Sequence, residues 1–203
     1  MSVISQLINS NMSKILYIKA NPKKDVDSFT FQVSELFIKK YKENNPNDEI
    51  EILDLYNSDI DFLRENDIAL AYSGGSEMMQ KYAKQFVSAD KYVIATPMWN
   101  LGLPAIFKAY IDCVLLAGVT FKYGENGPKG LTKENSKLIH IVACGGDYSK
   151  MPGMGDKYLR VIMGFLGIGD IETIAIGKTS LGDEGKKQLV AAKEKAEKLA
   201  KEW

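Results

Sequence analysis

The chain has 203 residues, with 26 Lys and Arg against 26 Asp and Glu, so its formal net charge is zero. This balance argues against broad binding to nucleic acid or to an anionic membrane surface. No apolar run approaches the roughly 20 residues that span a bilayer, which also argues against a transmembrane protein. The length suits one domain with a full core.

Residues 1–12 carry neither the basic start nor the long apolar core of a signal peptide. We therefore expect a loose N-terminal extension at 1–12 and a single domain at 13–203. Either Met1 or Met12 fits as the start of the chain. The two cysteines, Cys113 and Cys144, form no CxxC pair or framework spacing, which predicts a reducing, cytoplasmic location.

Five short apolar runs alternate with stretches of helical spacing along the chain. The runs, predicted as strands, are 14–19, 49–55, 92–95, 137–143 and 171–176. The predicted helices are 28–43, 77–88, 105–116, 156–166 and 182–203. Alternation of this kind predicts an α/β protein whose parallel sheet carries helices on both faces. The common small solution orders the strands 2-1-3-4-5, and the alternating second strand suits an edge.

Two stretches lack a clear pattern. Residues 57–75 mix acids with scattered apolar side chains, and we expect loop and a short helix that could fold over a site. Residues 117–130 are long and rich in glycine but contain Phe121 and Tyr123, which argue against disorder. Loops this long in a compact domain are usually functional, so this one is a candidate border of a pocket.

In the predicted fold, three turns converge at the carboxyl ends of strands, where such sheets bind ligands. Ser28 and Thr30 open a helix, where hydroxyls act as plain caps or hold a phosphate. The segment Met98–Leu101 offers Trp99 and Met98 to a flat ligand, or folds back onto the core. Gly145 and Gly146 either let backbone N–H groups approach a ligand or make a tight turn that needs positive φ.

Several site types find no support in the sequence. His140, the single histidine, lies inside a predicted strand, which favours a structural role, and no Ser/His/Asp set is expected around it. Metal-ligand spacing is absent, so no metal site is predicted. No GxGxxG or GxxxxGK[ST] motif occurs, which removes the sequence basis for a Rossmann or P-loop nucleotide site.

The three turns together offer a phosphate seat, a surface for a flat ring and amides for its polar edge. At this point the chain resembles the FMN-dependent NADH-azoreductases, also called NADH:quinone oxidoreductases, of the flavodoxin-like superfamily. The resemblance runs from about residue 13 to the C-terminus. It is carried by 97–101, 117–123 with 125–128, and Gly145-Gly146, and also by 154–159 and 165–167.

The resemblance implies a three-layer flavodoxin-like fold and one tightly bound FMN per subunit of a homodimer, each site being built partly by the partner. It implies that NADH gives up its hydride and leaves before a quinone or azo compound enters, a two-step (ping-pong) mechanism in which no side chain acts as nucleophile or obligatory acid. Cofactor-binding positions would be Ser28, Phe29, Thr30, Met98, Trp99, Asn100, Leu101, Ala143, Cys144, Gly145 and Gly146. Phe121, Tyr123 and Tyr148 would border the substrate pocket.

Two competing functions remain. A flavodoxin-type electron carrier would have no small-molecule substrate of its own, but such carriers are usually strongly acidic. A hydrolase acting on acyl carrier protein would need a nucleophile and a base near the site, and the sequence offers none.

The chain departs from the family pattern at three places. Ala143-Cys144 stands where the family usually has Ser-Arg, Phe29 replaces a polar residue between the two hydroxyls, and the segment after the second strand is short. Backbone N–H groups are unaffected by these changes, so FMN binding is expected to persist. The resemblance implies the preferred hydride donor and the range of substrates less directly. The helix 156–166 is apolar around most of its girth, which predicts a partner subunit against it.

Overall fold

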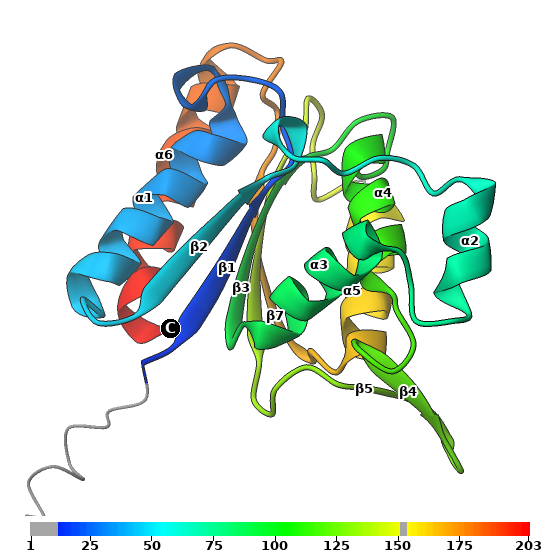
Figure 1. Cartoon of the computed structure of the whole chain (residues 1–203). Helices are drawn as coiled ribbons and strands as arrows, with labels where there is room; N and C mark the ends of the chain where they lie inside the picture. The colour runs from blue at the N-terminus through cyan, green and yellow to red at the C-terminus, as the bar shows by residue number, and fades with distance from the viewer. Residues whose placement is uncertain (1–11, 151–153) are drawn as a thin grey trace, which may run out of the picture.

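A five-stranded parallel sheet forms the centre of the computed structural model, which describes residues 12–150 and 154–203. The strand order is β2-β1-β3-β6-β7 (Figure 1). Counted without the small hairpin described below, this is the predicted order 2-1-3-4-5, which is confirmed. The strands are β1 (Lys14–Lys19), β2 (Glu49–Asp54), β3 (Lys91–Pro97), β6 (Lys137–Ala143) and β7 (Asp170–Ile176).

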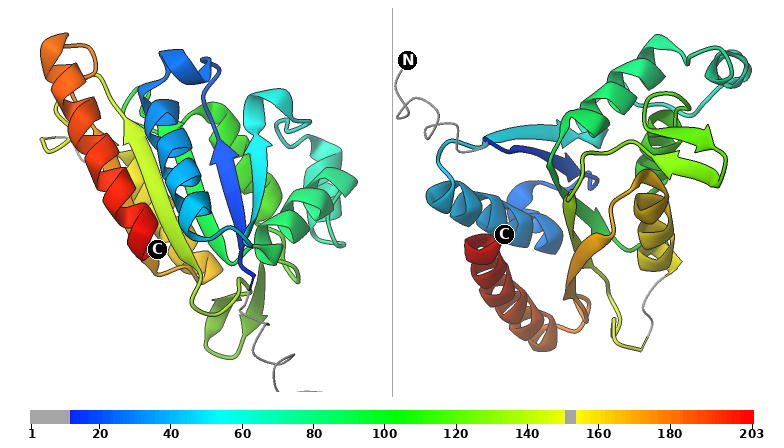
Figure 2. Two further views of the ribbon diagram at one scale, coloured as in Figure 1. Left: turned by 90° about the vertical axis from the view of Figure 1, so that its left-hand side faces the viewer. Right: turned by 90° about the horizontal axis from the view of Figure 1, so that it is seen from below.

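Helices cover both faces of the sheet, as predicted. In the left view of Figure 2 one pair of helices lies in front of the sheet, and in the right view, from below, the other helices lie on the opposite side of the sheet from this pair. The pair is α1 (Phe29–Asn44) and α6 (Asp183–Glu202). The opposite layer contains α3 (Glu77–Ser88), α4 (Ala105–Val114) and α5 (Met154–Leu166).

Alternation along the central strands divides the core into two clusters. On β1, Ile15 and Tyr17 join the cluster under α1 and α6, whereas Leu16 and Ile18 join the cluster under α3, α4 and α5. Each of these four side chains is fully buried, which stabilises the fold by roughly 1.5–3 kcal/mol per aliphatic side chain. β2 is the edge strand that its sequence predicted, and only one of its six residues is buried.

The segment 117–130, expected to be a loop, contains an antiparallel hairpin. Its strands are β4 (Phe121–Gly124) and β5 (Gly127–Gly130), and Gly127 takes the positive φ of 100° that its turn requires. The buried Thr120 hydroxyl fixes its base by donating to the Val114 carbonyl at 2.7 Å. The sequence pattern did not predict these two short strands, because glycine and proline interrupt the alternation that is typical of a strand.

The remaining connections are short or exposed. η2 (Asp25–Asp27) and η3 (Leu55–Asn57) follow β1 and β2, and α2 (Glu65–Ala71) confirms the short helix expected within 57–75. The predicted extension 1–12 lies, apart from Met12, outside the described residues. Across 12–150 and 154–203, no helix combines the length and apolar character needed to cross a membrane.

Candidate functional site

A pocket of about 230 Å³ opens at the carboxyl edge of the sheet, where three connections meet. The connections are β1–α1, β3–α4 and β6–α5, the three turns that the sequence predicted to converge. Eight predicted cofactor-binding residues line it: Ser28, Phe29, Thr30, Met98, Trp99, Ala143, Cys144 and Gly145. Asn100, Leu101 and Gly146 lie on the same turns but do not line this pocket.

The N-terminus of α1 presents two hydroxyls to the pocket. Ser28 caps the helix by accepting a hydrogen bond from Phe31 N at 3.2 Å, and it also accepts from Asn21 Nδ2 at 3.0 Å. With both lone pairs of Ser28 Oγ engaged, its O–H remains free to donate. Thr30 is 1% exposed, and its hydroxyl has no hydrogen-bond partner in the described structure. Ser28 is therefore a cap, and both hydroxyls remain able to donate to an anion.

Two ion pairs of the buried Lys19 with partly exposed carboxylates fix the loop before α1. Lys19 Nζ lies 2.6 Å from Asp25 Oδ1 and 2.8 Å from Glu35 Oε1, although Lys19 is only 8% exposed. Burial acts to lower the pKa of Lys19, but its hydrogen bonds to the two carboxylates outweigh that effect and raise the pKa. The loop that carries Asn21 and Ser28 is thus tied to the end of β1.

The second turn is strained at its tip. Trp99 and Gly102 exchange two backbone hydrogen bonds, of 3.0 and 2.9 Å, around Asn100 and Leu101. Both tip residues have positive φ, 50° and 67°, and for leucine this costs roughly 1–2 kcal/mol. Trp99 is 42% exposed and Leu101 is 50% exposed, so the turn does not fold back onto the core. An exposed apolar turn held under strain beside a pocket is typical of a ligand site.

The third turn offers backbone N–H groups. Neither Gly145 nor Gly146 has positive φ, so a left-handed turn is not the reason for these glycines. A Cβ on Gly145 would lie 2.7 Å from Ser180 Oγ, which favours a small residue there. Within the described residues neither glycine N–H donates to a protein acceptor. Burial raises the pKa of the neighbouring Cys144 thiol, which therefore stays protonated at neutral pH.

Five lining residues were not among the predicted binding positions, although the first three belong to the predicted turns 20–30 and 97–101. Asn21 and Lys23 belong to the loop after β1, Pro97 ends β3, and Thr179 and Ser180 follow β7. The Thr179 N–H and hydroxyl both donate to the Cys144 carbonyl, at 3.1 and 3.0 Å, which brings the loop after β7 against the third turn. The parallel sheet could have indicated this loop, because its last strand ends at the same edge.

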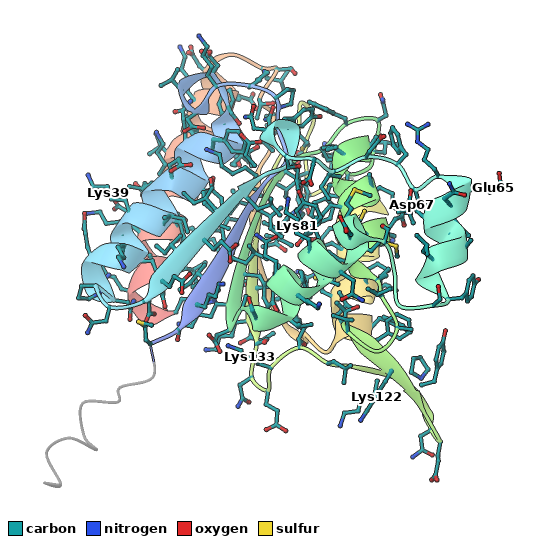
Figure 3. All side chains as sticks on the ribbon, viewed as in Figure 1. Lys39, Glu65, Asp67, Lys81, Lys122 and Lys133 are labelled. Carbon is teal, nitrogen blue, oxygen red and sulfur yellow. The ribbon has the colours of Figure 1, made fainter. Side chains whose placement is uncertain are left out.

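The three residues expected to border a substrate lie elsewhere in this chain. Phe121 and Tyr123 are on β4, and Phe121 packs against Phe165, with ring centroids 5.0 Å apart. Figure 3 places Lys122, between them, beyond the opposite end of the sheet from the pocket. Their hairpin packs against the C-terminal end of α5, which lies far from the pocket, so these two residues cannot reach the pocket of their own chain. Tyr148 lies beside Gly177, and its buried hydroxyl does not line the pocket.

A hydroxyl–histidine–carboxylate set does surround His140, contrary to the sequence expectation. Its Nε2 lies 2.9 Å from Thr96 Oγ1, and its Nδ1 lies 3.3 Å from Asp156 Oδ1. Thr96 and His140 are completely buried, so the hydroxyl cannot meet a substrate. The set links β3, β6 and α5 and supports the structural role predicted for His140.

The sheet order and a pocket at its switch point define a flavodoxin-like protein. The flavodoxin-like fold family matches residues 13–200. A Clostridium perfringens protein named FMN-dependent NADH:quinone oxidoreductase is 52% identical over 199 residues, covering 95% of this chain and 100% of that protein. The chain belongs to this family of oxidoreductases.

Two solved structures extend the comparison. Azoreductase AzrA has a TM-score of 0.86 and 33% identity, covering 94% of this chain and 100% of AzrA. The FMN-dependent NADH-azoreductase of Bacillus anthracis str. Ames Ancestor, solved in complex with FMN, has a TM-score of 0.83 and 29% identity. That match covers 92% of this chain and 97% of the azoreductase.

Proposed function

We propose that this protein is an FMN-dependent oxidoreductase that transfers a hydride from NADH to quinones and azo compounds. The observation that carries the proposal is the Thr30 hydroxyl, which is buried in the wall of the pocket and has no partner among residues 12–150 and 154–203. A buried polar group of this kind costs roughly 1–3 kcal/mol unless a ligand satisfies it. Relatives named for FMN and NADH support the choice of ligand.

The residues of the pocket fit the parts of FMN. Its phosphate would accept from the Ser28 and Thr30 hydroxyls at the positive end of α1. Met98 and Trp99 would face the ring, and the N–H groups of Gly145 and Gly146 would meet its polar edge. The side chains of Phe29, Ala143 and Cys144, which differ from the family pattern, take no part in this scheme.

When bound, FMN supplies the hydride chemistry, and the protein supplies position and environment. The strained turn 98–102 holds Met98 and Trp99 at the wall of the pocket. The ion pair of Lys19 and Asp25 keeps the phosphate loop in place. Transfer to a quinone takes one hydride from NADH and one proton from water, and yields NAD⁺ and a hydroquinone.

The proposal includes a homodimer, because the pocket of one chain is small for its ligand. A volume of about 230 Å³ lies below the roughly 300–1,000 Å³ typical of sites that enclose a cofactor. The layer of α2 to α5, with its turns and hairpin, carries several exposed large apolar side chains, which include Tyr72, Trp99, Leu101, Tyr123 and Val161. A second chain on this layer would cover them and bring its Phe121 and Tyr123 toward the acceptor. A cytoplasmic location, which the cysteine usage predicts, completes the proposal.

Flavin binding and hydride transfer can be tested in one cuvette. The apo-protein is titrated with FMN, and the quenching of flavin fluorescence gives the dissociation constant. The loaded protein is then mixed anaerobically with NADH and afterwards with a quinone. We expect tight FMN binding, loss of visible flavin absorption with NADH, and its return with the quinone. Absence of FMN binding at micromolar protein would refute the proposal, and bleaching without recovery would favour an electron carrier.

A further inference from the structure

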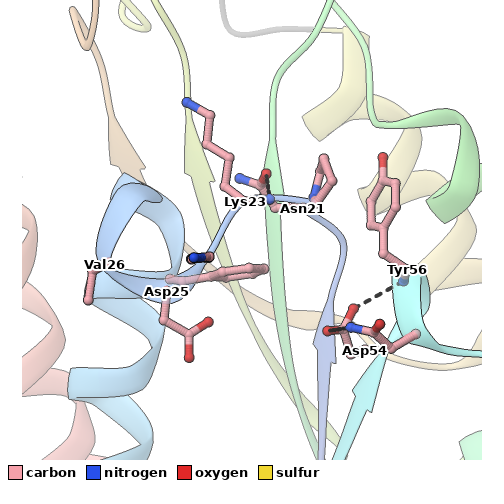
Figure 4. Close-up of a pocket in the computed structure, with 10 residues that line it drawn as sticks. Asn21, Lys23, Asp25, Val26, Asp54 and Tyr56 are labelled. Carbon is pink, nitrogen blue, oxygen red and sulfur yellow. Dashed lines mark hydrogen bonds between the residues drawn. The ribbon is translucent and has the colours of Figure 1, made fainter.

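A second pocket, of about 490 Å³, lies on the outer side of the loop after β1. Its walls come from this loop and from the turn after β2, and they include Lys23, Lys24, Asp54 and Tyr56 (Figure 4). Asn21 and Lys23 line both this pocket and the proposed FMN site. The two pockets therefore meet across one loop.

The charges in this pocket favour an anion. Two carboxylates also line it: Lys19 neutralises Asp25 at 2.6 Å, and Asp54, on the opposite wall, is outnumbered by Lys23 and Lys24. Lys23 and Lys24 form no ion pair with a carboxylate of the described residues. Two uncompensated ammonium groups on one short loop suit a doubly charged phosphate group.

The opposite wall is suited to the rest of a nucleotide. In Figure 4, Tyr56 and Lys23 stand on either side of Asn21, and both side chains project beyond the strand ends. Tyr56 is 40% exposed, which leaves part of its ring available to a planar base. Asp54 ends β2 and accepts from Tyr56 N at 3.0 Å and from Asn57 Nδ2 at 2.7 Å. These bonds fix the carboxylate and leave lone pairs for hydroxyl donors.

We propose that this pocket holds the adenylate half of NADH, and the inference rests on the proposed function. Lys23 and Lys24 contact the pyrophosphate, Asp54 accepts from the ribose hydroxyls, and the adenine lies against Tyr56. The shared wall at Asn21 and Lys23 allows one dinucleotide to run from this pocket over the FMN site. A carboxylate at the end of the second strand serves the ribose in the same way in dinucleotide-binding sheets.

The same carboxylate sets donor preference. A 2′-phosphate on the ribose would place its negative charge beside Asp54, so NADPH is the poorer donor. Asp54→Asn removes that repulsion and keeps an oxygen for Tyr56 N. In this variant the KM for NADPH falls towards the KM for NADH, so the ratio of the two decreases.

Direct binding is measured with ADP-ribose, which carries the adenine, both riboses and the pyrophosphate but no nicotinamide. It is titrated calorimetrically into the FMN-loaded wild type and into Lys24→Gln and Tyr56→Leu. Loss of one exposed charge contact weakens binding about 1.5- to 5-fold, and loss of a stacking ring weakens it about 5-fold or more. Lys39→Gln is the matched control, because Lys39 is an exposed lysine on α1 outside this pocket (Figure 3). ADP-ribose that fails to bind the wild type, or that binds all four proteins equally, overturns the inference.

Flavin bleaching with two donors separates this inference from the proposed function. The donors are NADH and N-benzyl-1,4-dihydronicotinamide, which lacks the adenylate. Lys24→Gln and Tyr56→Leu raise the NADH concentration needed for half-maximal bleaching rate and leave that of the benzyl donor unchanged. The inference is overturned if this concentration shifts equally for both donors. It is also overturned if the variants change only the KM of a sulfonated quinone acceptor. In both cases hydride transfer itself stands. Failure of both donors to bleach the flavin refutes the proposed function instead.

Discussion

His140 Nδ1 lies 3.3 Å from Asp156 Oδ1, and the imidazole is completely buried between β6 and α5. Burial lowers the pKa of His140, so the ring is neutral at neutral pH. A neutral ring donates from Nδ1 to Asp156 and accepts from the Thr96 hydroxyl at Nε2. Hydrogen bonds from His140 and Arg160 hold the pKa of Asp156 well below its usual range.

This relationship predicts a loss of stability in weak acid. A histidine with a lowered pKa takes up its proton more readily when unfolded, so its stabilising effect is present above the unfolded pKa of about 6.5 and is lost below it. Asp156 contributes no change in this range, because its lowered pKa keeps it ionised. We expect the free energy of unfolding to fall by up to about 1.4 kcal/mol per pH unit below pH 6.5. Urea titrations of the wild type and His140→Gln measure it, and parallel pH profiles of the two would contradict the prediction.

Thr30→Val separates ligand binding from folding. The substitution keeps the shape of the side chain and removes a hydroxyl that has no partner in the part of the chain that the structure describes, so the apo-protein keeps or gains stability. The FMN dissociation constant should rise, because a hydrogen bond to a charged phosphate contributes roughly 1.5–3 kcal/mol. Ser34→Ala is the control one turn further along α1. Ser34 Oγ bonds Tyr17 OH at 2.5 Å, so this variant should lose stability and keep its FMN affinity. An unchanged FMN affinity in Thr30→Val would place the phosphate elsewhere.

The sequence predicted the sheet and most of the pocket because both depend on local pattern. Buried runs such as 14–19 and 137–143 define strands, and strand order then brings Ser28, Met98 and Gly145 to one edge. The features that the sequence did not predict depend on tertiary contacts. Thr179 reaches the pocket through its bonds to Cys144, and Asp156 reaches His140 across a helix–sheet contact. The hairpin 121–130 is held by Thr120 and by the close approach of Gly130 to the Leu166 backbone, neither of which has a sequence signature.

Steady-state kinetics should show alternating substrates. In the proposed site the nicotinamide and the acceptor would both lie against the same face of the flavin ring, so they would not occupy the site together. Initial rates measured against NADH at several fixed quinone concentrations should give parallel double-reciprocal lines. Intersecting lines would indicate a ternary complex and a divided or larger pocket.

A charge on α5 should disrupt the proposed dimer. Val161 is 70% exposed on this helix, whereas its neighbours Leu159 and Met163 are completely buried. Val161→Glu should therefore leave the monomer folded and place an unpaired charge in the interface, where burial of such a charge is strongly unfavourable. Light scattering gives the mass, and circular dichroism checks the fold. A variant that is monomeric but fully active, or a wild type that is monomeric at micromolar concentration, would contradict a shared site.

Mixed dimers test whether Tyr123 acts on the partner's pocket. Tyr123 is 77% exposed on the hairpin, so Tyr123→Ala should keep the fold and FMN affinity. Loss of an aromatic contact of about 1 kcal/mol should raise the acceptor KM about 5-fold. Dimers are assembled, at limiting FMN, from one Tyr123→Ala chain and one Thr30→Val chain. If the sites are shared, one site combines the intact Thr30 of the first chain with the intact Tyr123 of the second. Such dimers should regain wild-type KM at one of their two sites. If each chain instead builds its own site, neither site is intact and no recovery occurs.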